Sequence, residues 1–320
     1  MRYLSVFSGI EAASVAWHDF GWTPVGFSEI EPFPCAVLKH RFPNVPNYGD
    51  ITRHAEWPLS AGDVDILIGG SPCQSFSRAG FKQGLADPRG NLALVFLAVA
   101  DRLKPKWIIW ENVPGALSSN GGEDFSTILW ALAEIGYCCA WRVLDARHFG
   151  IPQRRRRIWL VGYRNPVTGL GDWRPPAEAL FDEQPVLGHH PNIGTEEKDG
   201  SISADACAEE MLRIPVAFQP GNLRRKAGSD PSFEVFPTLK AGIGDQSPHV
   251  AWNGVARRLS AREVERVQGF PDDWTMIGWK GKSSEECPDE PRYTAVGNSM
   301  AVPCVRWVGS RIKIVESKCT

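Results

Sequence analysis

Three places in the chain carry side chains that could do chemistry. Cys73 lies in a loop of Gly, Ser and Pro residues, where backbone N–H groups could stabilise a thiolate for nucleophilic attack. Glu111 and Asn112 follow one apolar run, and the acids Glu29 and Asp50 come after an earlier one. Each residue alone has a simpler explanation, because a single cysteine is usually a small buried hydrophobe and acids at strand ends are often merely solvated. The chemistry therefore depends on whether the fold brings these side chains together.

Short apolar runs suited to buried strands alternate with helix-like stretches in the first half of the chain. The runs cover residues 3–7, 25–27, 64–68 and 107–110, and the clearest helical stretches cover 91–103 and 125–135. This alternation predicts an α/β fold with a doubly wound, mostly parallel sheet. In such a sheet, ligands bind beyond the carboxyl ends of the strands. The Gly turn at residues 8–11, the acids, the thiol and the asparagine all follow such ends, so we expect them at one edge.

The composition of the second half of the sequence indicates a change of architecture. Strand-rich stretches end near Arg164, and the region beyond is rich in Pro, Gly, Asp and Glu. Ser260 and Glu263 have capping-box spacing ahead of a short helix, and one more helical stretch follows Asn298. We predict a large domain of residues 1–164 plus 286–320 and a smaller, irregular domain of residues 165–285.

Composition excludes several classes of protein. The 320 residues, 43% hydrophobic and 22% charged, are typical of a folded globular protein. The longest apolar run, residues 92–100, is too short to cross a bilayer, and the N-terminus lacks the features of a secretory signal. We therefore expect a cytoplasmic protein with no membrane partner. The cysteines show no zinc-ligand spacing, so no metal site is expected.

Taken alone, the net charge of −2 argues against a nucleic-acid partner, since phosphate binding usually leaves a basic footprint. The cations are nevertheless clustered, at residues 154–157, 224–226 and 257–258. Net charge is therefore the wrong measure, and the distribution of the cations leaves DNA binding open.

Five motifs, in family order, resemble those of the DNA (cytosine-5) methyltransferase family. Pro72-Cys73-Gln74 resembles the catalytic Pro-Cys loop, Glu111-Asn112-Val113 the Glu-Asn-Val motif, and residues 153–157 the Gln-x-Arg-x-Arg motif. Residues 258–271 match the late Arg-Glu…Gln-Gly-Phe-Pro motif, and Gly297-Asn298-Ser299 matches the C-terminal Gly-Asn-Ser. The resemblance covers residues 1–163 and 257–311 and implies a Rossmann-like methyltransferase fold of bacterial or phage type.

The resemblance implies S-adenosylmethionine as methyl donor and S-adenosylhomocysteine as product. Phe7 would lie against the adenine, Ser8 and Gly9 along the methionine chain, Glu29 on the ribose hydroxyls and Asp50 on the adenine amino group. The cofactor-binding residues that it implies are Phe7, Ser8, Gly9, Glu29, Ile30, Asp50, Ile51, Pro72, Asn298 and Ser299. The family commonly has a second Gly where this chain has Glu11, so cofactor affinity is the property that this departure would change.

The resemblance also implies a mechanism. Cytosine C5 is a weak nucleophile, so the Cys73 thiolate would first add to C6 of a cytosine flipped out of a specific duplex DNA sequence. Glu111 would act as the acid at N3, and Asn112 would hold the loop or contact the base. Arg155 would hydrogen-bond the cytosine O2, and Arg157 would position that neighbourhood. The sequence names no evident base for removal of the C5 proton.

Partners follow from the same resemblance. Residues 1–164 plus 286–320 would form the catalytic and cofactor-binding domain, and residues 165–285 the target-recognition domain. The expected contacts with double-stranded DNA are Gln74, Ser75, Ser77, Arg154, Arg224, Arg225, Lys226 and Thr238. We expect a monomer in a bacterial or phage-infected cell, and functional pairing with a restriction endonuclease is a further expectation.

Three alternatives stay open. A tRNA cytosine-5 methyltransferase would share the catalytic motifs, although the long recognition segment and the Gln-Gly-Phe-Pro motif favour duplex DNA. A catalytically silent DNA-binding protein on the same fold is conceivable because of Glu11, but the intact Cys73, Glu111 and Arg155 argue against it. A nicotinamide oxidoreductase is weaker still, since no Gly-x-Gly-x-x-Gly follows the first strand.

Overall fold

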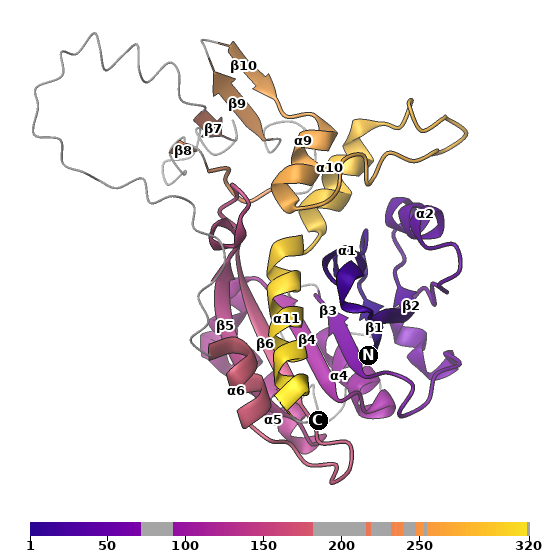
Figure 1. Cartoon of the computed structure of the whole chain (residues 1–320), viewed down its shortest axis with the longest axis vertical. Coiled ribbons are helices and arrows are strands. Elements are labelled where there is room, and N and C mark those ends of the chain that lie inside the picture. Colours follow the sequence, from indigo (N-terminus) through magenta and orange to yellow (C-terminus); the bar gives the residue numbers. More distant parts are fainter. Residues whose placement is uncertain are drawn as a thin grey trace, which may run out of the picture. The chain divides into compact units, whose positions relative to one another are not determined.

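A computed structural model describes residues 1–71, 92–181, 216–218, 232–233, 235–239, 248–252 and 255–318 of the chain (Figure 1). It divides into two compact units. The first comprises Met1–Leu144, Arg156–Gln184 and Cys304–Thr320, and the second comprises Asp145–Arg155 and Pro185–Pro303.

The first unit is built on a six-stranded sheet with the order β2-β1-β3-β4-β6-β5. Neighbours among β1, β2, β3 and β4 are parallel, and β6 pairs antiparallel with β4. The predicted α/β fold with a mostly parallel sheet is therefore confirmed. The strands are β1 (Arg2–Val6), β2 (Thr23–Ser28), β3 (Ile66–Gly69), β4 (Trp107–Asn112), β5 (Cys138–Asp145) and β6 (Arg156–Tyr163).

Helices cover both faces of this sheet. Alternate strand residues, among them Leu4, Leu67 and Ile108, join side chains of α4 and α5 in one large hydrophobic core. On the opposite face, Tyr3 stacks edge-on against Trp17 after α1, and the Trp107 indole donates to Glu316 of α11. This two-sided burial explains why the strands are almost continuously apolar.

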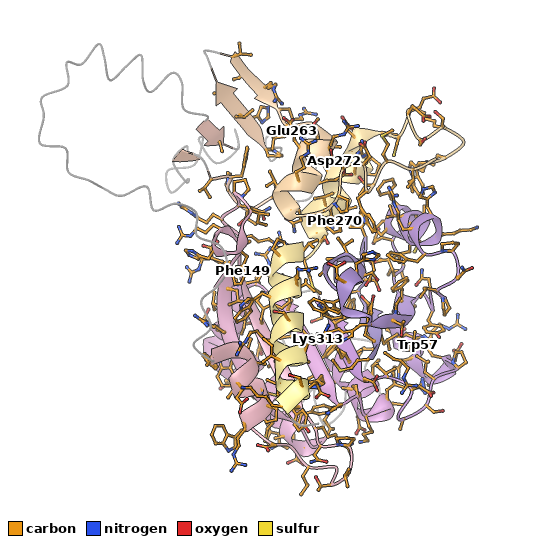
Figure 2. All side chains as sticks on the ribbon, viewed as in Figure 1. Trp57, Phe149, Glu263, Phe270, Asp272 and Lys313 are labelled. Carbon is orange, nitrogen blue, oxygen red and sulfur yellow. The ribbon has the colours of Figure 1, made fainter. Side chains whose placement is uncertain are left out.

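The helices of the first unit begin and end where the sequence provides caps. Pro32 occupies the first turn of α2, and Gly136 follows α5 with a positive φ of 90°. The α-helices are α1 (Ala12–Ala16), α2 (Pro32–Arg41), α4 (Leu92–Leu103), α5 (Glu123–Glu134), α6 (Arg174–Phe181) and α11 (Val302–Lys318). Short 3-10 helices are η1 (His18–Phe20), η2 (Ile51–Glu56), η4 (Pro114–Leu117) and η5 (Ser119–Gly122). Trp57, which follows η2, contributes its buried indole to the core (Figure 2).

The C-terminal helix α11 returns to the N-terminal part of the chain. The Trp17 indole donates to the carbonyl of Val305, and a Cβ on Gly309 would lie 2.1 Å from that indole nitrogen. Only glycine fits at this approach. The large unit is therefore assembled from both ends of the chain.

The second unit holds a four-stranded sheet, β10-β9-β7-β8, in which neighbouring strands are antiparallel. The strands are β7 (Val216–Phe218), β8 (Ser232–Phe233), β9 (His249–Trp252) and β10 (Val255–Arg258). The helices are η6 (Ala146–Phe149), α9 (Ala261–Gln268) and α10 (Asp289–Asn298). The capping box of Ser260 and Glu263 is present as predicted, whereas the small sheet and α10 were not predicted.

The division into units differs from the predicted domain boundaries for visible reasons. The segment after residue 164 stays with the large unit, because Leu180 of α6 is buried and its carbonyl accepts from Arg142 of β5. The segment at 289–298 belongs to the second unit, because Arg292 of α10 pairs with Glu265 of α9. No helix in the described part of the chain combines the length and apolar character needed to span a membrane.

Candidate active site

The carboxyl ends of the four parallel strands are in register. Val6 of β1 lies opposite Ser28 of β2 and Gly69 of β3, and Gly69 lies opposite Trp110 of β4. The segments that follow these strands therefore start at one edge of the sheet, as predicted. These strand ends and the segments after them hold the turn at residues 7–11, Glu29, Ser71 and the pair Glu111 and Asn112.

The turn after β1 is tied to Glu29. The Gly9 N–H donates to Glu29 Oε2 at 2.7 Å, and Oε1 accepts the backbone N–H groups of Ile30 and Glu31 at 2.8 Å each. Gly9 has a φ of +55°, and a Cβ there would meet no heavy atom within 4 Å. The turn thus presents bare backbone to an open space beside an oriented carboxylate.

Ser8 has a structural role in this turn. Its hydroxyl donates to the carbonyl of Ser5 at 2.8 Å and accepts the Ser28 N–H at 3.1 Å. The side chain thereby joins the ends of β1 and β2, and the Ser8 backbone does the same within the turn, because its N–H donates to the Ser28 carbonyl and its carbonyl accepts the Glu11 N–H.

Asn47 is a residue that sequence analysis missed. Its Oδ1 accepts the N–H groups of Glu29 and Gly49, and its Nδ2 donates to the Glu29 carbonyl at 3.0 Å. One amide therefore fixes the Glu29 segment to the segment that leads into Asp50. The available signal was a single polar residue two positions before Gly49, which is too common to be informative.

The other expected cofactor residues of the first unit differ in exposure. Asp50 is exposed and caps η2 by accepting the Thr52 N–H at 2.9 Å. Ile30 is 65% exposed, and Phe7 is partly buried against the core. Ile51 is only 4% exposed and belongs to the hydrophobic core. The side chain of Ile51 is therefore a core residue, a use that sequence analysis did not foresee.

Glu11 points away from the surface of the turn. It has a φ of 65°, caps α1 and accepts the backbone N–H and the hydroxyl of Ser14 at 3.1 and 3.0 Å. The side chain is completely buried. Burial raises the pKa of the Glu11 carboxyl to about 7, although the hydroxyls of Ser5 and Ser14 lower it.

Asn112 connects the ends of β3 and β4. Its Nδ2 donates to the Ser71 carbonyl at 3.0 Å, and the Trp110 indole donates to the Ser71 hydroxyl at 3.0 Å. All three residues are buried. Ser71, the last described residue before the Pro-Cys motif, is thus fixed against the Glu-Asn-Val motif.

Glu111 is paired with Arg157. The Nε of Arg157 lies 3.3 Å from Glu111 Oε1, and the two side chains are 16% and 11% exposed. β6 runs antiparallel to β4, with Trp159 opposite Glu111, which brings the start of β6 beside the end of β4. A glutamate and an arginine of the predicted motifs therefore lie side by side, and the arginine is Arg157.

Arg155 is used differently from the expected role at cytosine O2. It is 3% exposed, and its guanidinium donates to the carbonyls of Leu239, Gly297 and Ser299 within the second unit. The Ser299 contact is 2.7 Å long. A guanidinium that donates to three carbonyls, two of them in the Gly-Asn-Ser motif, holds the backbone of that motif in place.

The two glutamines of the family motifs meet in the same unit. Gln153 Nε2 donates to Gln268 Oε1 at 2.7 Å, and Gln268 Nε2 donates to the Ser299 carbonyl at 2.6 Å. Both glutamines are fully buried. Motifs far apart in the sequence are therefore joined into one hydrogen-bonded cluster.

Two expected DNA contacts lie next to this cluster. The Thr238 hydroxyl donates to the Arg154 carbonyl at 2.6 Å, and the Arg154 side chain is exposed. Of the expected cofactor residues in this unit, Asn298 is exposed and Ser299 is buried. Their contacts with a ligand stay predictions.

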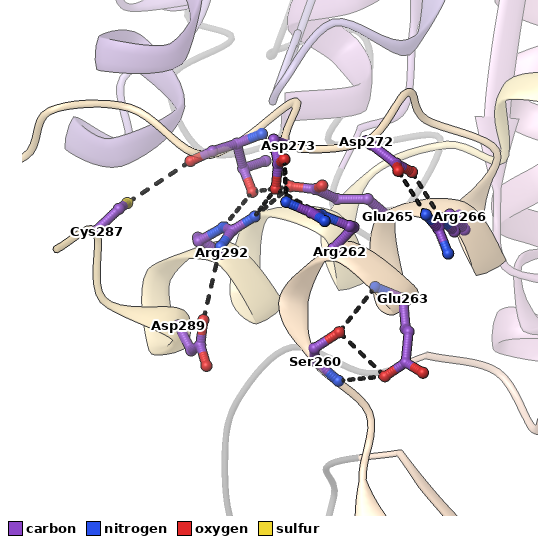
Figure 3. A network of polar contacts seen from close by, with 11 residues as sticks. Ser260, Arg262, Glu263, Glu265, Arg266, Asp272, Asp273, Cys287, Asp289 and Arg292 are labelled. Atoms are coloured by element: carbon purple, nitrogen blue, oxygen red, sulfur yellow. Dashed lines mark hydrogen bonds and ion pairs between the residues drawn. The ribbon is translucent and has the colours of Figure 1, made fainter. Parts of the chain in front are cut away.

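A buried ionic network supports the late motif in the second unit (Figure 3). Glu265 of α9 accepts from Arg292 Nη2 at 3.0 Å and from the Thr275 N–H at 2.9 Å. Exposed pairs surround it, joining Arg262 to Asp273 and Arg266 to Asp272. Arg257, one of the clustered cations, pairs with Glu263, and this contact lowers the pKa of the Glu263 carboxyl to about 2.

Several predicted site residues lie outside the described residues. They are Pro72, Cys73, Gln74, Ser75 and Ser77 of the Pro-Cys segment and Arg224, Arg225 and Lys226 of the basic cluster.

Comparison with known proteins decides the family. Residues 1–187 and 221–314, well over half of the chain, match the family described as C-5 cytosine-specific DNA methylase. The chain belongs to this family. It is a DNA cytosine-5 methyltransferase, as the five motifs predicted.

Two relatives and one solved structure illustrate the similarity. The type II methyltransferase M2.BsuMI of Bacillus subtilis is 31% identical over 98% of this chain and 75% of its own length. A protein of Escherichia phage P1 named DNA N-6-adenine-methyltransferase is 31% identical over 97% of this chain, which spans 61% of its length. The crystal structure of S. pombe Dnmt2 methyltransferase has a TM-score of 0.60 at 19% identity and covers 100% of this chain and 99% of its own. This last likeness supports the methyltransferase fold.

Proposed function

We propose that this methyltransferase modifies C5 of a flipped-out cytosine in a specific duplex DNA sequence, through a covalent bond between Cys73 Sγ and cytosine C6. The observation that carries the proposal is the junction of β3 and β4, where Asn112 holds Ser71 and Arg157 pairs with Glu111. Cys73 follows Ser71 by two residues in the sequence. The described segment that leads into the proposed nucleophile is therefore fixed beside the proposed acid.

The turn after β1 fits S-adenosylmethionine, which when bound supplies a methyl group on a positively charged sulfonium. The space in front of Gly9 admits a ligand close to the backbone. Glu29 Oε2 accepts one backbone hydrogen bond and keeps a lone pair for a ribose hydroxyl. Asn47 holds both Glu29 and the segment before Asp50, so it would orient the two acids together.

The Cys73 thiolate would add to C6 and push electrons toward C5, because cytosine C5 is too weak a nucleophile without this addition. The Glu111 carboxyl would donate a proton to N3, which neutralises the negative charge that develops on the ring. After the methyl group reaches C5, loss of the C5 proton would return electrons to the ring and expel the thiolate.

Arg157 would stabilise the charge on the cytosine, a role that sequence analysis gave to Arg155. The guanidinium of Arg157 lies beside Glu111, whereas that of Arg155 donates to carbonyls of the second unit. We therefore assign Arg157 the electrostatic role and treat Arg155 as a positioning residue for Ser299.

The name of the phage P1 relative specifies adenine N6 rather than cytosine C5. An exocyclic amine can attack a methyl donor directly and needs no thiol nucleophile, so the Pro-Cys and Glu-Asn-Val motifs favour cytosine. Methylation of tRNA and catalytic silence are the remaining alternatives, and one assay separates all four outcomes.

The test is incubation of genomic DNA, plasmid DNA and tRNA with isotopically labelled S-adenosylmethionine, followed by base-resolution mapping of 5-methylcytosine and N6-methyladenine. We expect 5-methylcytosine within one short duplex sequence, and no label with Cys73→Ser. Label on adenine or tRNA, no label at all, or equal label with Cys73→Ser would contradict the proposal. A duplex containing 5-fluorocytosine should trap a covalent complex with the wild type, because fluorine at C5 cannot leave as a proton does.

A further inference from the structure

The turn after β1 contains a buried carboxylate that the proposed mechanism does not use. Glu11 has a positive φ of 65°, a conformation that disfavours residues with a Cβ. The position nevertheless carries a long side chain, and this side chain is completely buried. Strained residues are common at functional sites. The capping of α1 alone does not explain a strained residue in a turn that is proposed to bind a ligand.

The two carboxylate oxygens of Glu11 are in different situations. Oε1 accepts the N–H and the hydroxyl of Ser14. Oε2 is buried and makes no hydrogen bond of ordinary geometry with a described residue, although the nearby Ser5 hydroxyl lowers the pKa of the carboxyl. A buried carboxylate oxygen without a partner is costly unless a proton or a cation compensates it.

The elements packed against Glu11 offer no cation in the described part of the chain. β1 contributes Tyr3, whose hydroxyl lies 2.6 Å from the Ser14 hydroxyl and whose pKa is raised by burial and by the Glu11 charge. Residues 12–16 of α1 carry no charge. Arg306 of α11, which donates to the Ala16 carbonyl, pairs with Asp19 at 3.0 Å. No described residue therefore neutralises the negative charge of Glu11 in an ion pair.

We propose that Glu11 determines cofactor selectivity, its buried negative charge favouring the cationic S-adenosylmethionine over the neutral thioether product. The inference rests on the proposed function, in which the turn at residues 7–11 holds the methionine part of the cofactor. Both ligands carry the same amino-acid group, so the sulfonium charge distinguishes them at this turn. Charges interact strongly across a protein interior because water does not screen them. Methyl transfer removes the sulfonium charge, so the attraction would end with the reaction and aid release of the product.

Protonation of Glu11 removes its charge, so the pH dependence of ligand binding separates the effect of the charge from that of the helix cap. The carboxyl has a pKa of about 7, so it is mostly neutral at pH 6 and mostly ionised at pH 8. A bound cation favours the ionised form. The affinity ratio of S-adenosylmethionine to S-adenosylhomocysteine should therefore rise with pH by up to about tenfold over this range.

The experiment measures the Kd of both ligands by calorimetry at pH 6 and pH 8, with the full chain and with DNA absent or present. Glu11→Gln retains an acceptor without the charge, and we expect a smaller ratio that does not change with pH. Ser14→Ala is the matched control, because it removes the hydroxyl that donates to Glu11 Oε1 but keeps the backbone N–H of residue 14 and the Glu11 carboxyl; the ratio should still rise with pH.

Each outcome decides one point. If Glu11→Gln weakens both ligands equally, or if the wild-type ratio is independent of pH, the inference is wrong while the proposed function stands. If the wild type binds neither ligand, the proposed function itself fails, and the inference with it. Thermal melting identifies a variant that does not fold, and the wild-type pH dependence then decides by itself.

Discussion

The Nε of Arg157 lies 3.3 Å from Glu111 Oε1, and both side chains are largely shielded from water. The pair joins the first residues of β6 to the end of β4, next to the point where Asn112 holds Ser71. An arginine here both orients the carboxyl group and supplies positive charge at the edge where the cytosine ring would become negative.

Replacement of Arg157 by alanine should lower the methyl-transfer rate constant by about 10²-fold or more, because preorganised positive charge at a developing anion is lost. Arg157→Lys should recover only part of the rate, since an ammonium does not reproduce the planar guanidinium. Single-turnover methylation measures the effect. The exposed neighbour Arg156 provides the control, and an equal loss in Arg156→Ala would show that general loop charge, not the Glu111 pair, is responsible.

Removal of the Asn47 amide should weaken cofactor binding without changing the chemical step. Asn47→Ala breaks the bonds that hold Glu29 and Gly49 together, and we expect the Kd of S-adenosylmethionine to rise about tenfold, roughly 1.4 kcal/mol. Calorimetry measures the Kd, and kcat at saturating cofactor should stay near that of the wild type. Asn44→Ala, an exposed residue of the same loop, should leave both unchanged. A large fall in kcat for Asn47→Ala would assign the residue to catalysis instead.

Two cations of the second unit should differ in their contribution to DNA binding. Arg154 is exposed, so Arg154→Ala should reduce the slope of log K against log salt concentration by about one if it contacts a phosphate. Arg257 already pairs with Glu263 at 2.8 Å, so Arg257→Ala should change the slope by less than half as much. Fluorescence anisotropy over a series of salt concentrations measures both slopes. Equal changes in the two variants would mean that the Glu263 pair opens when DNA binds.

Buried and exposed ion pairs in the network of Figure 3 should differ in their effect on stability. Glu265→Ala leaves the buried Arg292 without its closest carboxylate and should lower the free energy of unfolding by about 3–5 kcal/mol. Asp272→Ala breaks an exposed pair with Arg266, which solvent screens, and should leave the free energy of unfolding close to that of the wild type. Urea denaturation compares the two variants. Similar losses would show that burial does not govern this network.

Local patterns in the sequence were enough to predict much of the fold. The apolar runs marked the strands β1 to β4, and Ser260 with Glu263 marked the start of α9. These predictions succeeded because strand periodicity and helix caps depend on residues close together in the chain. The order of the motifs was likewise enough to predict the family, because it requires no knowledge of contacts.

The tertiary structure decided which side chains meet. Arg155 and Arg157 are two residues apart in one motif, yet one donates to Ser299, 144 positions away, and the other pairs with Glu111. Asn47 and Glu11 acquired their roles in the same way, through the Glu29 backbone and through burial beneath the turn after β1. Such contacts depend on packing between distant segments, and the identity of a residue does not state where its side chain is buried. The sequence therefore determined the chemistry available to this enzyme, and the fold determined which residues are placed to perform it.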